Sequence, residues 1–302
     1  MKPLVSAIIP NYNYARYVGE AVESALSQTY PNIEVIVVDD GSKDNSLKVL
    51  EKYRDRVKII EQVNSGVCVA RNRGVAESAG EYIAFLDADD VWLPAKIERQ
   101  VEKFASEDVL GLVHVGVTDI DALGKELATH LDGMEGDVAS ELMMFESAVI
   151  LGGGSGVMIP RKVFDKVGGF DDSLSTSADW DIYFRISSSF PVGFVDEPLL
   201  KYRLHGSNMH SNIKRMEHEM LFAYRKGFAA SERDGKVDEG KAYGGLFRVL
   251  AGSYFRAGKY GDFLRTAVKS VWYRPAGIGY FAAFPLRRLR KQQMNADQRG
   301  SV

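Results

Sequence analysis

Apolar segments that each end in polar or acidic residues recur through the first 105 residues, and this recurrence constrains the fold more than any other feature. The segments alternate with helical patterns and are Leu4–Ile9, Ile33–Val38, Val57–Ile60 and Tyr82–Leu86. The alternation predicts a parallel sheet with right-handed crossovers. The nearly continuous apolar character of Ile33–Val38 is typical of a strand covered on both faces. Ligands bind at the carboxyl ends of the strands in such a sheet, so the polar residues there form the candidate site.

An acidic tetrad, Asp87-Ala88-Asp89-Asp90, follows the last of these segments. Three carboxylates at one strand end repel one another, and a divalent cation would neutralise them. Hard oxygen ligands at this spacing suit Mg²⁺ or Mn²⁺, above all if a substrate diphosphate completes the shell. The alternative is a solvated acidic turn that leads into a helix near Pro94. The polar residues at the neighbouring strand ends favour the metal site.

Polar motifs occur in a fixed order along about two thirds of the chain. They are Pro10-Asn11-Tyr12-Asn13, Val37-Val38-Asp39-Asp40-Gly41-Ser42, Gly66 with Ala70-Arg71-Asn72-Arg73-Gly74, Phe85-Leu86-Asp87-Ala88-Asp89-Asp90, Val167-Gly168-Gly169-Phe170-Asp171, Asp179-Trp180-Asp181 and Tyr202-Arg203-Leu204-His205. In this set and order the sequence resembles the family 2 glycosyltransferases. The resemblance implies an α/β fold of the GT-A type (nucleotide-diphospho-sugar transferase), a Rossmann-like mixed sheet flanked by helices. It also implies an inverting transferase that uses a nucleotide-sugar donor and a divalent metal, Mg²⁺ or Mn²⁺.

The first two strand ends form the predicted nucleotide site. Asp40 can accept a hydrogen bond from the N3–H of a uracil or thymine ring, Tyr12 can stack on the base, and Pro10 shapes the turn. Alone, Asp40 could equally cap the turn before Gly41, and Tyr12 could pack in a core. Together they favour a UDP- or dTDP-sugar. Arg71 is the predicted diphosphate contact, with a solvated helix arginine as the alternative.

The resemblance also assigns roles at the metal site. It implies that Asp89 is the direct metal ligand and that Asp87 faces the ribose. His205 matches a family histidine that reaches the phosphates or the metal from a mobile loop, although a lone histidine is more often a surface residue. Asp90 is expected to be structural, as a cap for the following helix.

Asp179-Trp180-Asp181 precedes an apolar helical stripe and marks the predicted acceptor side. The family has a Glu-Asp pair here, and its Asp takes the proton of the acceptor hydroxyl. This chain has Ala178 in place of the Glu, which puts the local positioning in doubt, while Asp179 keeps the position of the general base. An N-cap is the alternative role for Asp179. Trp180 is predicted to form the floor under the sugar or acceptor, with core packing as the alternative, and Gly152–Gly156 to be a flexible segment beside the acceptor cleft.

Two regions follow from these patterns. Residues 1–210 are the predicted transferase domain, with a nucleotide-binding half at 1–105 and an acceptor half at 106–210. Residues 211–302 are the predicted helical C-terminal appendage. One helical face there carries Leu246, Val249, Leu250, Ser253 and Tyr254. A tight turn at Ala257–Tyr260 leads to a second helix with apolar positions Phe263, Leu264, Ala267, Val268 and Val271, so an αα-hairpin is expected.

The sequence Tyr280–Lys291 is apolar and then basic. Such a tail could lie on an anionic membrane surface, and a solvated, frayed terminus is the alternative. The segment Met1-Lys2-Pro3 leads directly into a strand rather than an apolar leader, and no apolar run reaches the length of a spanning helix. We therefore expect a cytoplasmic protein, with peripheral contact to the inner face of the cell membrane through this tail.

Composition excludes several other functions. A net charge of −3 over 302 residues argues against a general nucleic-acid binder. The single cysteine, Cys68, excludes an internal disulfide and a multi-cysteine zinc site, and its apolar neighbours predict a buried thiol. A dinucleotide-dependent dehydrogenase is disfavoured because the first strand ends in Pro10–Asn13 rather than in a G-x-G-x-x-G turn. A nucleotidyltransferase and a catalytically silent relative stay open as functions, but the metal carboxylate Asp89 and the base Asp179 are both present.

These features together predict an inverting, metal-dependent glycosyltransferase. It would move a sugar from a UDP- or dTDP-sugar to a hydroxyl of a glycan or lipid-linked acceptor, with Asp179 as the general base. The identity of the sugar and of the acceptor depends on pocket shape, which loops determine.

Overall fold

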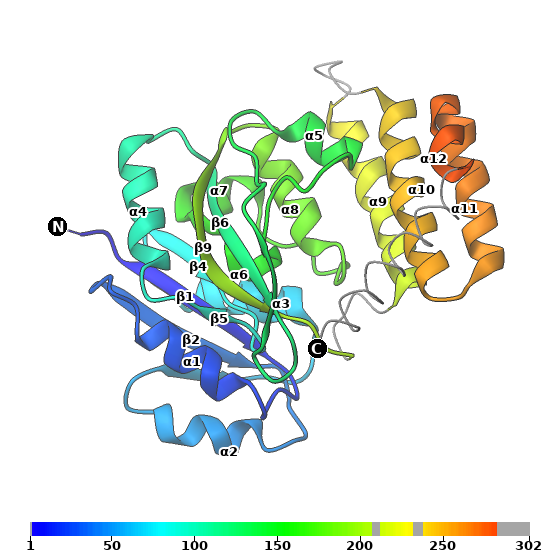
Figure 1. Cartoon of the computed structure of the whole chain (residues 1–302). Helices are drawn as coiled ribbons and strands as arrows, with labels where there is room; N and C mark the ends of the chain where they lie inside the picture. Colours follow the sequence, from blue (N-terminus) through cyan, green and yellow to red (C-terminus); the bar gives the residue numbers. More distant parts are fainter. Residues whose placement is uncertain (1, 207–211, 232–237, 283–302) are drawn as a thin grey trace, which may run out of the picture. The chain divides into compact units, whose positions relative to one another are not determined.

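The computed structural model describes residues 2–206, 212–231 and 238–282 (Figure 1). The chain divides into two compact units, one of Met1–Leu142 with Ser147–Glu232 and one of Met143–Glu146 with Arg233–Val302. Helix α9 (Ile213–Ser231) lies beyond the predicted domain boundary at residue 210 but is part of the first unit. The predicted basic tail, from Arg287 to Lys291, lies outside the described residues.

The first unit is built on a nine-stranded mixed sheet with the strand order β3-β2-β1-β4-β8-β6-β9-β5, and β7 pairs with β6. The predicted parallel strands form as expected: β1 (Val5–Asn11), β2 (Ile33–Asp39), β3 (Lys58–Glu61) and β4 (Tyr82–Phe85). The direction reverses at β8 (Met158–Pro160), which is antiparallel to both of its neighbours. The remaining strands are β5 (Val91–Trp92), β6 (Leu112–Ile120), β7 (Glu126–His130) and β9 (Val192–Arg203).

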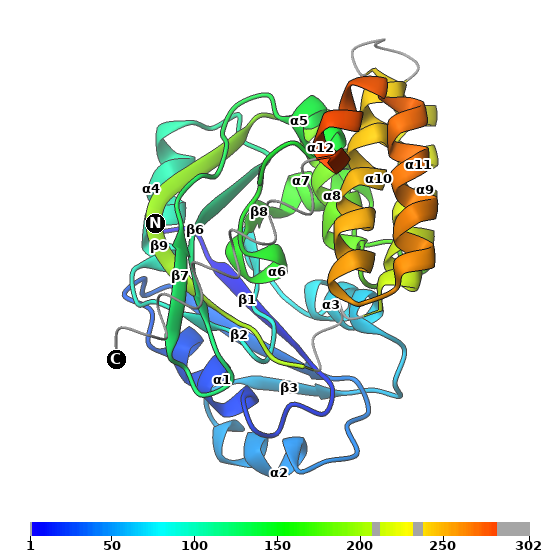
Figure 2. The same cartoon turned by 45° about the vertical axis from the view of Figure 1, so that its right-hand side comes forward.

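Helices cover both faces of this sheet (Figures 1 and 2). Alternation along β1 separates the two cores, because Val5, Ala7 and Ile9 pack on one side and Ile8 on the other. The first side is covered by α1 (Val18–Leu26), α2 (Ser46–Leu50), η1 (Glu51–Tyr53) and α4 (Lys96–Ser106). The second side is covered by α3 (Val67–Ala76), α7 (Arg161–Val167) and α8 (Ala178–Ser187). Cys68 on α3 is buried, as predicted.

The second unit contains the predicted helical hairpin. Helices α10 (Glu239–Arg256) and α11 (Tyr260–Tyr273) pack side by side, and Gly258 takes a φ of +71° in the turn between them. The 3₁₀ turn η3 (Pro275–Gly277) and α12 (Ile278–Ala282) follow. Within the described residues, no helix combines the length and the apolar character that are needed to cross a membrane.

The apolar positions of this hairpin are only partly where the sequence placed them. In α10, Leu246 and Tyr254 are buried as expected, whereas Val249 is 36% exposed. In α11, Leu264 and Val268 are exposed, because the helix turns its small polar residues toward its neighbour.

A buried histidine lies in the core of the first unit. His114 on β6 is fully buried, its Nε2 lies 2.8 Å from the carbonyl oxygen of Met134, and its Nδ1 accepts a hydrogen bond from the backbone N–H of Leu151 at 3.2 Å. These contacts require a neutral ring with the proton on Nε2. Burial lowers the pKa of His114 from 6.5 to about 4, and the hydrogen bond to Met134 opposes this only in part.

We predict that His114 weakens the fold in acid. The imidazole of His114 binds a proton near pH 6.5 in the unfolded chain but only near pH 4 in the folded chain. The unfolding free energy is therefore unaffected above pH 6.5 and falls by about 3 kcal/mol as the pH drops from 6.5 to 4. His114→Gln should remove this pH dependence, although it destabilises the neutral protein. Urea unfolding at about pH 7 and about pH 4.5 measures the difference. The control is the exposed His218→Gln; equal acid sensitivity of the two variants would contradict the prediction.

Candidate active site

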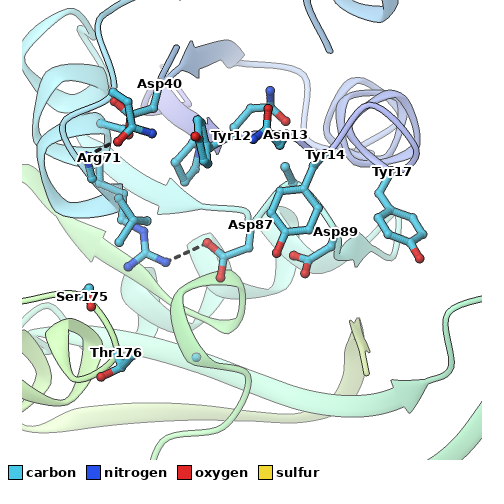
Figure 3. Close-up of a pocket in the computed structure, with 18 of the residues that line it drawn as sticks. Tyr12, Asn13, Tyr14, Tyr17, Asp40, Arg71, Asp87, Asp89, Ser175 and Thr176 are labelled. Carbon is cyan, nitrogen blue, oxygen red and sulfur yellow. Dashed lines mark hydrogen bonds and ion pairs between the residues drawn. The ribbon is translucent and has the colours of Figure 1, made fainter. Parts of the chain in front are cut away.

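A cavity of about 580 Å³ opens at the carboxyl ends of the parallel strands. Figure 3 shows Tyr12 and Asp40 toward one end and Asp87 and Asp89 further along it. Seven residues predicted from the sequence line this cavity: Pro10, Tyr12, Asp40, Arg71, Asp87, Asp89 and Asp179. The two other predicted site residues, Trp180 and His205, are not among its lining residues.

Two loops are tied together at the predicted nucleotide end. Asn13 has a φ of +60°, a conformation that asparagine tolerates better than most residues. The side-chain oxygen of Asn13 accepts a hydrogen bond from the backbone N–H of Lys43 at 2.7 Å. The backbone N–H of Asn13 donates to Ser42 Oγ at 2.9 Å. The neighbouring Tyr12 is 40% exposed and faces the cavity. The turn after β1 therefore presents an aromatic ring that is available for stacking.

Asp40 is almost fully buried and already holds three donors. Its Oδ1 accepts hydrogen bonds from Gln62 Nε2 and from the Ser65 N–H, and its Oδ2 accepts one from the Gly66 N–H, each at 2.8 Å. A carboxylate offers about four acceptor sites, so about one is left for a ligand. The turn-capping role that was the alternative for Asp40 belongs instead to Asp39, whose Oδ1 accepts from the Ser42 N–H at 2.8 Å.

The acidic tetrad is held in place by a buried serine. Ser155 Oγ accepts a hydrogen bond from the Asp87 N–H at 3.0 Å and donates one to Asp90 Oδ2 at 2.6 Å. Asp90 also accepts from the Arg203 N–H at 2.9 Å. Burial, together with the charges of Asp89 and Asp87, raises the pKa of Asp90 well above its usual range. Asp90 is thus structural, as expected, but the predicted helix cap is wrong, because α4 begins only at Lys96.

Asp89 pairs with His205, so the structure brings the two predicted metal ligands together. His205 Nε2 lies 2.8 Å from Asp89 Oδ2, and the imidazole stacks on Tyr17 with ring centroids 5.4 Å apart. Burial and the charge of Asp87 raise the pKa of Asp89, and the hydrogen bond from His205 opposes this. Burial and the charges of Asp89 and Asp87 raise the pKa of Tyr14, which also lines the cavity. Among the described residues, no cluster of three or more His, Cys, Asp or Glu side chains could hold a metal ion.

Arg71 joins the two sides of the cavity. Its Nη2 lies 2.7 Å from Asp87 Oδ1, and its Nη1 lies 2.6 Å from Asp179 Oδ1. The guanidinium is fully buried and stands over the ring of Phe170 at 5.0 Å. Arg71 is therefore not a solvated helix residue. Its two terminal nitrogens bind carboxylates of the chain itself, which differs from the predicted contact with a diphosphate.

The glycine-rich segment, which we expected to be flexible, supports this arrangement. It contains a short helical turn, α6 (Gly153–Gly156), and Gly154 donates its N–H to Asp179 Oδ2 at 3.1 Å. A Cβ on Gly154 would lie 2.5 Å from Arg71 Nη2. The absence of a side chain at this position thus allows the guanidinium to reach both carboxylates.

Trp180 points away from the cavity. Its indole stacks on Phe184 and on Tyr224 of α9, with centroids 5.4 and 4.9 Å apart, and its Nε1 donates to the carbonyl oxygen of Leu142 at 3.1 Å. Successive residues of a helix point about 100° apart, so a tryptophan next to a cavity-facing Asp179 turns toward the core. The structure therefore places Trp180 in core packing, the alternative to its predicted role as a floor.

Sequence reasoning missed several lining residues, of which Ser175, Thr176 and Arg215 lie on the side that is predicted to bind the acceptor. Glu219 on α9 organises them: it accepts hydrogen bonds from the Ser175 N–H and hydroxyl at 3.0 and 2.8 Å and from the Thr176 hydroxyl at 2.9 Å, and it pairs with Arg215 at 2.7 Å. Burial would raise the pKa of Glu219, but these bonds outweigh it and lower the pKa to about 2. The pair with Arg215 is a local i,i+4 contact within α9. No local pattern signals the bonds of Glu219 to Ser175 and Thr176, because they form between α9 and a loop that is distant in sequence.

The mixed sheet and the carboxylates at its edge define a glycosyltransferase with a GT-A fold, and the comparisons support this class. The family model described as glycosyl transferase family 2 matches residues 6–167. An uncharacterized glycosyltransferase of Nostoc sp. is 34% identical over 89% of this chain and 86% of its own length. The chain belongs to glycosyl transferase family 2.

Two further relatives carry more specific names. A putative teichuronic acid biosynthesis glycosyltransferase of Bacillus subtilis, TuaG, is 31% identical over 74% of this chain and 88% of its own length. A chondroitin synthase of Escherichia coli is 32% identical over 71% of this chain, but the match spans only 31% of that enzyme.

Solved structures share the fold at low sequence identity. S. aureus TarS 1-349 in complex with UDP-GlcNAc gives a TM-score of 0.64 at 16% identity, over 89% of this chain and 81% of that chain. The mannosyltransferase PcManGT from Pyrobaculum calidifontis, in complex with GDP-Man and Mn²⁺, gives a TM-score of 0.62 at 18% identity, over 97% of this chain and 85% of that chain.

Gly154→Ala tests the bridge formed by Arg71. The new methyl group would displace the guanidinium from two carboxylates, and overpacking of this kind costs about 1–3 kcal/mol. We expect turnover to fall roughly 10-fold or more, with a melting temperature several degrees lower. Gly261→Ala is the matched control, because its Cβ would meet open space. Sugar-transfer kinetics and thermal melting decide the matter; unchanged turnover in Gly154→Ala would show that the bridge has no part in activity.

Proposed function

We propose that this enzyme transfers a sugar, with inversion, from a UDP- or dTDP-sugar to a hydroxyl of a glycan or lipid-linked acceptor. One observation carries the proposal: a single cavity is lined by Tyr12 and Asp40, by Asp87 and Asp89, and by Asp179. A stacking ring, a diphosphate-side acidic pair and a carboxylate base are the groups that this reaction needs. TarS, a structural neighbour, was solved with UDP-GlcNAc, which supports a uridine donor.

The residues at the strand ends would bind and orient the donor. Tyr12, which is partly exposed, would stack on the base. Asp40 would accept the N3–H of uracil or thymine with its remaining acceptor site, which a guanine or adenine ring does not match in the same way. Asp87 would face the ribose, and its link to Arg71 fixes the carboxylate in one orientation.

The donor set near Asp89 fits Mg²⁺ or Mn²⁺. Mg²⁺ is usually held by one or two carboxylates together with substrate phosphates, so a complete cage of protein ligands is not required. Asp89 and His205 would hold the ion, with Asp87 beside them, and the mutual repulsion of the carboxylates favours a cation. When bound, the ion would neutralise charge on the leaving diphosphate. The Mn²⁺ in the PcManGT complex supports the same metal class.

Asp179 would act as the general base. Arg71 and the Gly154 N–H hold its two oxygens, and its side chain is 29% exposed toward the cavity. The acceptor oxygen would attack the anomeric carbon while Asp179 takes its proton, and the bond to the diphosphate oxygen would break with its electron pair on the nucleotide. One such in-line displacement inverts the anomeric centre without a covalent sugar–enzyme intermediate.

The acceptor proposal rests on the relatives and on the charge of the chain's end. TuaG is named for teichuronic acid biosynthesis, which supports a cell-surface glycan as the acceptor class. The basic segment from Arg287 to Lys291 would hold the enzyme at an anionic membrane surface, on the cytoplasmic side, where lipid-linked acceptors are presented.

Nucleotide binding tests the donor site. We expect UDP or dTDP to bind more tightly than GDP or ADP, and UDP binding to strengthen when Mg²⁺ or Mn²⁺ replaces a chelator. Asp40→Ala should weaken UDP binding by roughly 1–3 kcal/mol, because it leaves the ring donor unpaired. Asp89→Ala should remove the metal dependence, and the exposed Asp55→Ala is the control. Calorimetry decides; tighter binding of GDP than of UDP would refute the assignment of Asp40.

Asp179→Asn tests the base. It keeps the size of the side chain but cannot accept the proton, so kcat should fall about 10²–10⁴-fold while nucleotide affinity stays near that of the wild type. Asp181→Asn is the matched control. Asp181 lies on the same helix as Asp179 and forms a buried ion pair with Arg185, but it does not line the cavity. Product stereochemistry by NMR completes the test. Retention of the anomeric configuration, or normal turnover in Asp179→Asn, would show that the role is misassigned.

A further inference from the structure

Helix α11 buries small polar residues and exposes large apolar ones, which is the reverse of a helix that packs on a core. Its buried residues are Thr266 and Ser270, whereas large apolar side chains face outward at every fourth position. These outward residues form what we call the outer stripe: Tyr260, Leu264, Val268 and Trp272, which are 54%, 61%, 68% and 75% exposed. Single exposed apolar residues are common on proteins, but a contiguous row on one helix face indicates an interaction site.

Close packing on the other side explains why α11 turns this way. Ser270 Oγ donates to the carbonyl oxygen of Gly244 on α10 at 2.7 Å, and Thr266 Oγ1 donates to that of Asp262 at 2.7 Å. A Cβ on Gly244 would lie 3.5 Å from the Ser270 carbonyl oxygen. Small residues thus let the two helices approach, and the larger apolar side chains are left on the outside.

The same region carries a strong positive charge. Its described part, residues 239–282, contains 7 Lys and Arg against 2 Asp and Glu, a formal charge of +5, whereas residues 1–238 contain 26 against 38, a formal charge of −12. Arg265 and Lys269 come from the flank of the outer stripe on α11 itself, and Lys259 immediately precedes the helix. An occupant of this surface must therefore be apolar at the centre and anionic around it.

We infer that the outer stripe of α11 docks on an anionic lipid surface. An interfacial helix has this composition: aromatic and aliphatic residues on one face and basic residues beside them. Tyr260 and Trp272 stand at the two ends of the stripe, and such amphipathic rings suit the headgroup level. A second copy of this chain is disfavoured, since the dimer would bring two regions together that each carry a formal charge of +5 in residues 239–282. The inference deepens the proposed membrane role and rests on it only for the acceptor. It adds a contact through α11 to the one that is proposed for the basic tail.

Vesicle binding by the full chain tests this inference. Vesicles of phosphatidylcholine alone and of phosphatidylcholine with phosphatidylglycerol are compared by co-sedimentation. The double variant Leu264→Gln/Val268→Gln keeps good helix formers and should reduce partitioning into the anionic vesicles roughly 10-fold or more. The matched control is Leu127→Gln/Val109→Gln, which changes equally large residues that are 53% and 61% exposed in the first unit. It should bind vesicles as the wild type does.

Tryptophan fluorescence locates the contact. The three tryptophans are Trp92, which is buried, Trp180, which packs against Tyr224, and Trp272, which is exposed. Anionic vesicles should shift the emission to the blue, and Trp272→Phe should abolish that shift. Helical circular dichroism and UDP-sugar hydrolysis should be unchanged in the double variant, which separates failure of docking from failure of the proposed enzyme.

Three outcomes would overturn the inference. The first is a full chain that does not bind anionic vesicles. The second is vesicle binding and a blue shift that survive in the double variant and are lost on truncation after Ala282, which would place the contact in the tail and leave the membrane proposal standing. The third is a dimer, detected by light scattering and lost in the double variant, without vesicle binding, which would identify a second copy as the occupant.

Discussion

The ion pairs of Arg71 with Asp87 and Asp179 are the interaction on which the site depends. A buried guanidinium is costly unless it is paired, and removing one partner of such a pair is strongly destabilising. Asp87 follows β4 and Asp179 lies in the first turn of α8, so the bridge fixes the distance between the proposed donor side and the proposed acceptor side. Gly154 and Ser155 complete it, since one binds Asp179 and the other binds the backbone of Asp87. The bridge links four segments that are distant in sequence.

Much of the fold could be predicted because its signals are local. The parallel strands β1, β2 and β4 and the amphipathic α1 follow from the spacing of apolar residues, and the lining residues at the strand ends follow from that topology. The failures are tertiary. The partners of Arg71 come from residues 16 and 108 positions away. The packing of Trp180 depends on α9, and the orientation of α11 depends on small residues that form close helix contacts. Apolar spacing predicts a helix but does not state which side faces the protein.

The doubt raised by Ala178 is answered by other parts of the chain. The family glutamate would adjoin the proposed base in sequence, whereas here Arg71 and the Gly154 N–H hold Asp179 directly. The segment immediately before Asp179 is secured by Glu219, which accepts hydrogen bonds from Ser175, Thr176 and the Ser177 N–H. A carboxylate is present near this loop after all, but it comes from α9.

The hydrogen bonds of Glu219 to this loop limit where the chain could be joined to part of a relative. A chimera that exchanged acceptor halves between relatives could be joined where the sheet ends, which in this chain is near Arg203. Such a joint would separate Ser175 and Thr176 from the carboxylate that orders them, because Glu219 lies beyond the joint. The smallest segment that keeps these contacts therefore runs through α9 to Ser231. A joint between Arg203 and Glu219 would pass on Asp179 without the carboxylate that supports its loop.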